Sequence, residues 1–189
     1  MTTEIDLSFP HRFACEALSE LPGGGNSRRL FFPPGQAGGR DGVTLRVQPE
    51  AGAPWIGTFA SAASNEHGIT RVVSLPDPDT LCVVSRGAGY IVSASTPDVW
   101  GPVLATPIVD VRAVVSAGIV VAATQTDILA IGDCGVKWRT KRLAWDGLRI
   151  VSIGDQTLRG EYQDLEDVVR TFEVDLMTGA AREHVTPPG

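Results

Sequence analysis

The chain has 189 residues, of which 43% are hydrophobic and 20% are charged, so it is long enough to bury a sizeable core. With 16 Lys and Arg against 22 Asp and Glu, the net charge is -6. This acidic balance argues against a general nucleic-acid-binding surface and against docking on anionic lipid, because both need a basic face, and we expect neither partner.

The segment from His11 to Leu21 is the candidate helix. Its apolar residues recur at helical spacing, at Ala14, Ala17, Leu18 and Leu21. A Pro-Gly-Gly-Gly run follows at once and would end a helix there. We therefore predict one short N-terminal helix.

The next segment reads as a loose unit of short strands over residues 28–60. Its β-rich runs are Leu30–Phe32, Val43–Val47 and Trp55–Phe59.

Three later segments begin alike and indicate an internal repeat with a period of roughly 36–42 residues. The openings are Arg71–Ser74, Ala113–Ser116 and Arg149–Ser152. Each opening is followed by a turn, a second β-rich run and a third one. The second runs are Leu81–Val84, Ile119–Ala122 and Leu158–Tyr162, and the third are Tyr90–Val92, Ile128–Ile131 and Phe172–Val174.

Short strands with a turn signal after each predict an all-β chain, and a repeat of this length is the size of a propeller blade. We predict a small propeller-like stack of three- or four-stranded antiparallel meanders, forming a single domain over 1–189. The repeat units are 28–60, 71–100, 113–140 and 149–182. Four units are few for a closed propeller, so a closed ring and an open stack both stay possible. At least one of two adjacent valines, Val114 and Val115, must face the core, and we expect Val115→Asp to destabilise the fold severely.

The units resemble blades of PQQ-type β-propeller repeats. The resemblance is carried by Asp127–Arg139, where a strand, a turn and Val-Lys-Trp-Arg follow in order, and by Val174–Gly179. Pro54–Gly57, Leu81–Val84 and Leu143–Leu148 are also similar to a family of uncharacterised bacterial proteins. The resemblance implies a fold and no activity, quinone site or calcium site.

Residues typical of metal or nucleophilic sites are scattered. The histidines, His11, His67 and His184, are far apart, and the three cysteines, Cys15, Cys82 and Cys134, form no CxxC pair. Asp77-Pro78-Asp79 has alternating carboxylates but lacks the further ligands of a calcium loop. We expect no metal, no cofactor and no catalytic residue. Three separate thiols, with no secretory signal at the N-terminus, favour a cytoplasmic protein.

Four carboxylates cluster between two predicted strands, at Glu161, Asp164, Glu166 and Asp167. Carboxylates this close in sequence could act as a general acid and base, or could lie on an exposed turn in water. An exposed acidic turn can also steer a basic partner. We take the four as candidate binding residues.

Four tryptophans lie at strand ends: Trp55, Trp100, Trp138 and Trp145. Packing between repeats is one role for such residues, and anchoring an interface is the other where they are exposed. Trp100 and Trp138 are the candidate binding residues among them.

These features favour a non-catalytic cytoplasmic protein-binding module, of which toxin-neutralising immunity proteins are one class. A small carboxylate-dependent hydrolase and a structural subunit of an oligomeric propeller are the alternatives. A protein partner is expected, and the sequence leaves the oligomeric state open.

Overall fold

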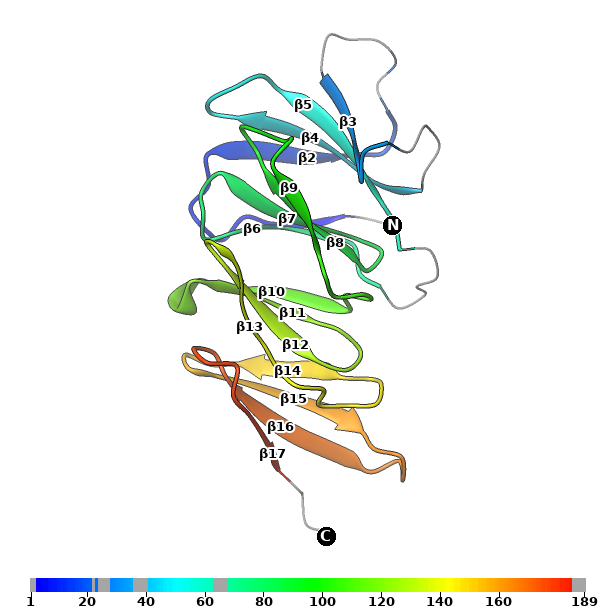
Figure 1. Ribbon diagram of the computed structural model, residues 1–189, viewed down its shortest axis with the longest axis vertical. Coiled ribbons are helices and arrows are strands. Elements are labelled where there is room, and N and C mark those ends of the chain that lie inside the picture. Colours follow the sequence, from blue (N-terminus) through cyan, green and yellow to red (C-terminus); the bar gives the residue numbers. More distant parts are fainter. Residues whose placement is uncertain (1–2, 22, 24–27, 36–40, 63–67, 185–189) are drawn as a thin grey trace. The chain divides into compact units, whose positions relative to one another are not determined.

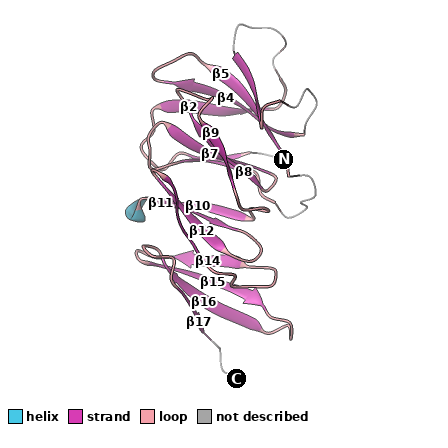
Figure 2. Ribbon diagram, viewed as in Figure 1, coloured by secondary structure: helices cyan, strands magenta, loops and turns pink. Residues whose placement is uncertain are grey.

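The computed structural model describes residues 3–21, 23, 28–35, 41–62 and 68–184, and this part of the chain is built almost wholly from strands (Figures 1 and 2). The strands form four sheets, and contacts divide the chain into two compact units, Met1–Ile108 and Val109–Gly189. The helical part of the described residues is a single 3-10 turn at Val115–Ala117. The prediction of an all-β chain made of propeller-like meander sheets is confirmed.

Each unit holds two sheets. In the first unit, one sheet has the order β2-β4-β5-β3, with β3 parallel to β5 and the other pairs antiparallel. These strands are β2 (Phe13–Leu18), β3 (Arg28–Phe32), β4 (Gly42–Pro49) and β5 (Trp55–Ala60). The other sheet is an antiparallel meander, β6 to β9, with β1 added in parallel to β6. Its strands are β1 (Glu4–Asp6), β6 (Arg71–Ser74), β7 (Thr80–Ser85), β8 (Ala88–Ser93) and β9 (Trp100–Val103).

The second unit consists of two antiparallel meanders in chain order. One contains β10 (Asp110–Val114), β11 (Ile119–Ala123), β12 (Ile128–Gly132) and β13 (Gly135–Arg139). The other contains β14 (Arg149–Ile153), β15 (Thr157–Gln163), β16 (Val169–Asp175) and β17 (Ala181–His184). These two sheets follow the expected repeats 113–140 and 149–182, and β6 to β9 follow 71–100. The first sheet adds β2, which lies outside the expected unit 28–60. That the whole chain forms a single domain stays a prediction.

The predicted helix over 11–21 is wrong, because this segment contains β2. The strand pairs with β4 along its length, from Phe13 opposite Pro49 to Leu18 opposite Thr44. Phe13, 5% exposed, packs into the core of the first unit. The backbone hydrogen bonds to β4 and the burial of Phe13 outweigh a helix propensity that is worth tenths of a kcal/mol per residue.

In each unit a tryptophan of one sheet donates its indole N–H to a backbone carbonyl that directly follows a strand of the other sheet. Trp55 Nε1 lies 2.7 Å from the carbonyl oxygen of Ala94, directly after β8. Trp138 Nε1 lies 2.9 Å from that of Leu176, directly after β16. Gly179 leaves room for the second indole, since a Cβ there would lie 2.7 Å from the Trp138 ring. The hydrophobic effect has no preferred direction, so apolar packing alone does not fix how two sheets align. These hydrogen bonds fix that alignment within each unit.

The faces turned away from these two cores carry ion pairs on the sheet β2-β4-β5-β3 and on the sheet β14 to β17. On the last sheet, Arg149 pairs with Glu161, and Arg159 Nε lies 2.8 Å from a Glu173 carboxylate oxygen. On the first sheet, Arg46 pairs with Glu16. Burying such faces against a further sheet would desolvate the charges. These ion pairs therefore disfavour a structural subunit that stacks through these faces.

The expectation for Val115 is wrong, because the strand ends one residue earlier. Val114 is the last residue of β10, is 6% exposed and belongs to the core of the second unit. Val115 begins the 3-10 turn and is 51% exposed. Gly118 ends this turn with φ 61, in the left-handed region that favours glycine. The valine that faces the core is therefore Val114.

We predict that Val114→Asp lowers the free energy of unfolding by about 3 kcal/mol or more, because it buries a carboxylate without a partner. Val115→Asp is the matched control and should change it by less than about 0.5 kcal/mol, since an exposed position keeps the charge in water. Urea unfolding of both variants measures the difference. Equal losses in the two variants would contradict the position of the strand end.

Candidate functional site

A pocket of about 450 Å³ lies in the second unit, beside the end of the β15–β16 hairpin. Its walls come from three parts of the chain: the segment 142–145 between β13 and β14, the hairpin from Tyr162 to Arg170, and Glu183 on β17. Its volume is within the range of pockets that bind small groups.

Strand register explains why these residues meet. Tyr162 on β15 lies opposite Arg170 on β16, and Phe172 on β16 lies opposite Glu183 on β17. Residues paired across strands share a face of the sheet, as do residues two apart on one strand. Tyr162, Arg170, Phe172 and Glu183 therefore share the face that carries the core, and the pocket lies where that face reaches its edge.

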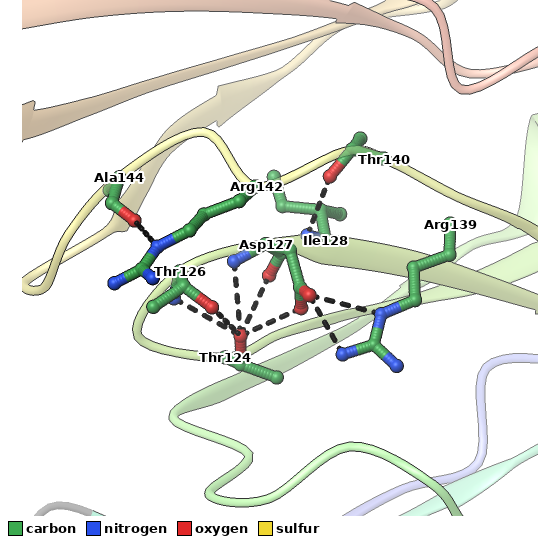
Figure 3. A network of polar contacts seen from close by, with 8 residues as sticks. All are labelled: Thr124, Thr126, Asp127, Ile128, Arg139, Thr140, Arg142 and Ala144. Carbon is green, nitrogen blue, oxygen red and sulfur yellow. Dashed lines mark hydrogen bonds and ion pairs between the residues drawn. The ribbon is translucent and has the colours of Figure 1, made fainter.

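The turn between β11 and β12 is ordered by a network of polar contacts, which Figure 3 shows, and its backbone binds the segment 142–145. Within the turn, Thr124 Oγ1 accepts the N–H of Asp127 at 3.0 Å and donates to its carboxylate at 2.8 Å. Arg139 binds the other carboxylate oxygen of Asp127 at 2.7 Å. The carbonyl of Thr126 then accepts the backbone N–H of Leu143 at 2.8 Å. The pocket wall is thus fixed by backbone hydrogen bonds to an ordered turn.

Arg142 and Trp145 form the rim of this wall. The guanidinium carbon of Arg142 lies 4.5 Å from the centre of the Trp145 ring, a cation–π contact. Arg142 also donates to the carbonyls of Ala144 at 2.9 Å and Trp145 at 3.0 Å. Trp145 is nevertheless 63% exposed, so most of its surface meets solvent.

The tip of the hairpin is organised by Asp164. Its carboxylate accepts the backbone N–H groups of Glu166 at 2.9 Å and Val168 at 3.0 Å, and Arg170 Nε at 2.7 Å. The bond from Arg170, followed by the one from Val168, lowers the pKa of Asp164 below its ordinary value. The turn holds Leu165 outward, with 80% of its surface exposed.

The hydroxyl of Tyr162 lies in a different electrostatic setting. Burial raises its pKa, and the negative charge of Glu183 raises it further, against the opposite effect of Arg170. Tyr162 is thus a neutral hydrogen-bonding group at neutral pH, and the field of Glu183 reaches it.

The four predicted carboxylates do not converge. Glu161 points to the opposite face of β15 from Tyr162 and pairs there with Arg149. Asp164 is taken up by the turn, while Glu166 and Asp167 are exposed at its tip. A general acid at neutral pH needs a raised pKa, whereas that of Asp164 is lowered. The geometry gives the hydrolase hypothesis no support.

The two predicted tryptophans lie in packing contacts. Trp100 is half-buried, with its ring 5.7 Å from Phe32 and 6.3 Å from Tyr90 between centroids. Trp138 is half-buried and donates to Leu176. Neither residue lines the pocket. Sequence reasoning named Trp145 only as one of four tryptophans, and it did not propose Tyr162, Leu165, Arg170 or Glu183 as site residues. The alternation along β15 was the available signal for Tyr162, because it separates that residue from Glu161.

Other chemistry considered from sequence is accounted for by local contacts. Among the described residues, no three His, Cys, Asp or Glu side chains are placed to hold a metal ion. The Asp79 carboxylate instead accepts the hydroxyls of Ser93 at 2.7 Å and Ser95 at 2.6 Å. Burial raises the thiol pKa to about 11 for Cys15 and about 12 for Cys82, which disfavours thiolate chemistry. His67 lies outside the described residues.

We predict that the charge of Asp164 stabilises the protein in a pH-dependent way. Its folded pKa lies below the unfolded value, so this contribution is full above about pH 4 and is lost as pH falls through the folded pKa. Asp164→Asn should lower the urea midpoint at pH 7, and the difference from wild type should shrink toward about pH 2. A difference that does not change with pH would contradict the role of the Asp164 charge.

Comparison with known proteins gives structural similarity without a family. No family model and no curated protein matches the chain. A crystal structure of the N-terminal domain of Nup159 is similar with a TM-score of 0.43 and 11% identity, over 97% of this chain and 53% of that one. The second similar structure is a chain of an S. cerevisiae complex, in which a Dbp5 variant is bound to Nup159, a Gle1 variant, IP6 and ADP. Its TM-score is 0.44 and its sequence identity is 12%, over 96% of this chain and 52% of that one. The chain thus spans about half the length of both of these similar chains.

No helix in the described part of the chain is long and apolar enough to cross a membrane.

Proposed function

We propose that this chain is a non-catalytic protein-binding module whose partner binds at the hairpin surface. This surface is defined by Trp145, Leu165, Glu166, Asp167 and Val168. The observation that carries the proposal is that Trp145 and Leu165, two large apolar side chains, line one pocket while most of each is exposed.

Burial of these two side chains would supply the binding energy. Complete burial of a leucine from water is worth about 1.5–3 kcal/mol, and tryptophan is enriched among the residues that dominate interfaces. Single exposed apolar residues are ordinary on a protein surface. Here two of them flank one hollow, a geometry that a partner side chain can fill.

The surface is also ordered before binding. The Asp164 turn fixes Leu165, and the bond from Leu143 to Thr126 fixes the segment that carries Trp145. An ordered surface loses little conformational entropy when a partner binds, which increases affinity for a given contact area.

Charge supports a basic partner. Glu166 and Asp167 are exposed beside the apolar pair, and the chain carries a net charge of -6. Such charges contribute little to stability but raise the association rate with a positive partner at low salt.

We propose that the module acts in the cytoplasm. The three free thiols, Cys15, Cys82 and Cys134, support this, because a reducing compartment keeps thiols free. A toxin-neutralising, immunity-type role is one form that such binding takes, and capture of a basic toxin would identify it. Kinship with bacterial proteins that carry PQQ-like repeats is part of the same proposal, and the meander sheets support it.

The experiment compares two double variants by capture from a lysate of the native host. Trp145→Ala with Leu165→Ala removes the apolar pair from the hairpin surface. Val99→Ala with Leu104→Ala removes two equally exposed apolar side chains from the first unit and is the matched control. We expect the control to retain a partner that wild type captures, and the hairpin variant to bind the purified partner at least about tenfold more weakly.

Thermal unfolding of both variants establishes that each remains folded. If the hairpin variant binds the purified partner as tightly as wild type does, the partner binds elsewhere and the proposal is overturned.

A further inference from the structure

We propose that the pocket between Trp145, Tyr162 and Leu165 receives an arginine side chain from the partner. This inference rests on the proposed function and specifies which chemical group of the partner the hairpin surface recognises.

The charges around the pocket favour a cationic side chain. Its two cations are already engaged: Arg170 binds Asp164, and Arg142 donates to two backbone carbonyls. Neither Glu166 nor Glu183 forms an ion pair within the described part of the chain, although the charge of Glu166 acts on Arg170 and raises its pKa. Both carboxylates are exposed. The residues that line the pocket thus carry three carboxylates against two guanidiniums, and this net negative charge favours a cationic group.

The walls of the pocket suit a guanidinium in shape and in chemistry. Trp145 and Tyr162 offer flat rings, and Leu165 offers an apolar side chain that can cover an aliphatic stem. A guanidinium is planar, stacks on aromatic rings and donates to two carboxylates at once, which an ammonium does less well. Arginine therefore fits these walls better than lysine does.

The chain itself already holds a guanidinium against Trp145. The Arg142 guanidinium already lies 4.5 Å from the Trp145 ring centre, so this ring accepts a guanidinium. Arg142 is tied by its own hydrogen bonds to the rim, and the pocket beside it keeps a volume of about 450 Å³. Glu183 lines the same pocket as Tyr162 and Trp145, and its charge raises the pKa of Tyr162.

The test uses a small probe with one side chain, Nα-acetyl-arginine methylamide. The neutral isostere Nα-acetyl-citrulline methylamide has nearly the same shape without the charge. Titration of each into the 189-residue protein is followed by NMR, at the indole N–H of Trp145 and the amide of Leu165. We expect saturable shifts with the arginine probe, and binding of the citrulline probe weaker by about fivefold or more.

Two double variants separate the pocket from net charge. Glu166→Gln with Glu183→Gln should weaken the arginine probe roughly tenfold. Asp133→Asn with Asp155→Asn removes the same number of charges outside the pocket and should leave its affinity unchanged. Equal binding of the two probes, equal affinity of the two variants, or no shift at Trp145 and Leu165 would each overturn the arginine pocket.

The partner captured by wild type distinguishes this inference from the proposed function. If the arginine pocket is wrong but the function is right, Glu166→Gln with Glu183→Gln binds that partner normally, whereas loss of Trp145 and Leu165 abolishes binding. If the function itself is wrong, the variant without Trp145 and Leu165 binds the partner as wild type does, whatever the probes show.

Discussion

A hydrogen bond from a tryptophan indole to a buried backbone carbonyl fixes the two sheets of each unit to one another. Trp55 donates to Ala94 and Trp138 donates to Leu176. In both units the accepting carbonyl directly follows the third strand of a four-stranded meander, after β8 and after β16. Leu176 is 1% exposed, so its carbonyl oxygen would have little access to water if Trp138 did not donate to it. An unsatisfied buried acceptor destabilises the folded state by about 1–3 kcal/mol.

The candidate site depends on this constraint in the second unit. Apolar packing alone allows two sheets to slide, because it has no preferred direction. The bond from Trp138 fixes the sheet that ends in β13, and the chain leaves β13 directly into the segment that carries Arg142 and Trp145. The Asp127 turn then holds that segment, and the register of β15 and β16 brings Tyr162 and Arg170 to it. The pocket is therefore a product of sheet alignment rather than of a local motif.

Much of the fold could be predicted from the sequence, because strand alternation and turn residues act over short distances. The runs at 71–74, 81–84 and 128–131 are strands as expected. The helix prediction failed because Phe13, Cys15 and Ala17 also alternate with period two, and pairing with β4 decided between the two patterns. The expectation for Val115 failed because a 3-10 turn begins at that residue, before the repeated pattern Ala113–Ser116 ends.

The site was less predictable because its members lie on three separate parts of the chain. Neighbours in sequence on a strand point to opposite faces, so the proximity of Glu161 and Asp164 in sequence says little about whether their carboxylates meet. Glu161 pairs with Arg149 on one face, while Glu183, nineteen positions beyond Asp164, lines the same pocket as that residue. Strand register is what brings Glu183 there, and the sequence pattern does not fix register across a whole meander.

Hydrogen exchange of the four indole N–H groups, measured by NMR, tests the central claim most directly. A proton held in a hydrogen bond between two sheets exchanges only when the sheets separate. The account predicts that Trp55 and Trp138 exchange slowly, at rates that follow the unfolding of their unit in low urea, while exposed Trp145 exchanges fast. Exchange of Trp138 as fast as that of Trp145, with the protein fully folded, would contradict the account.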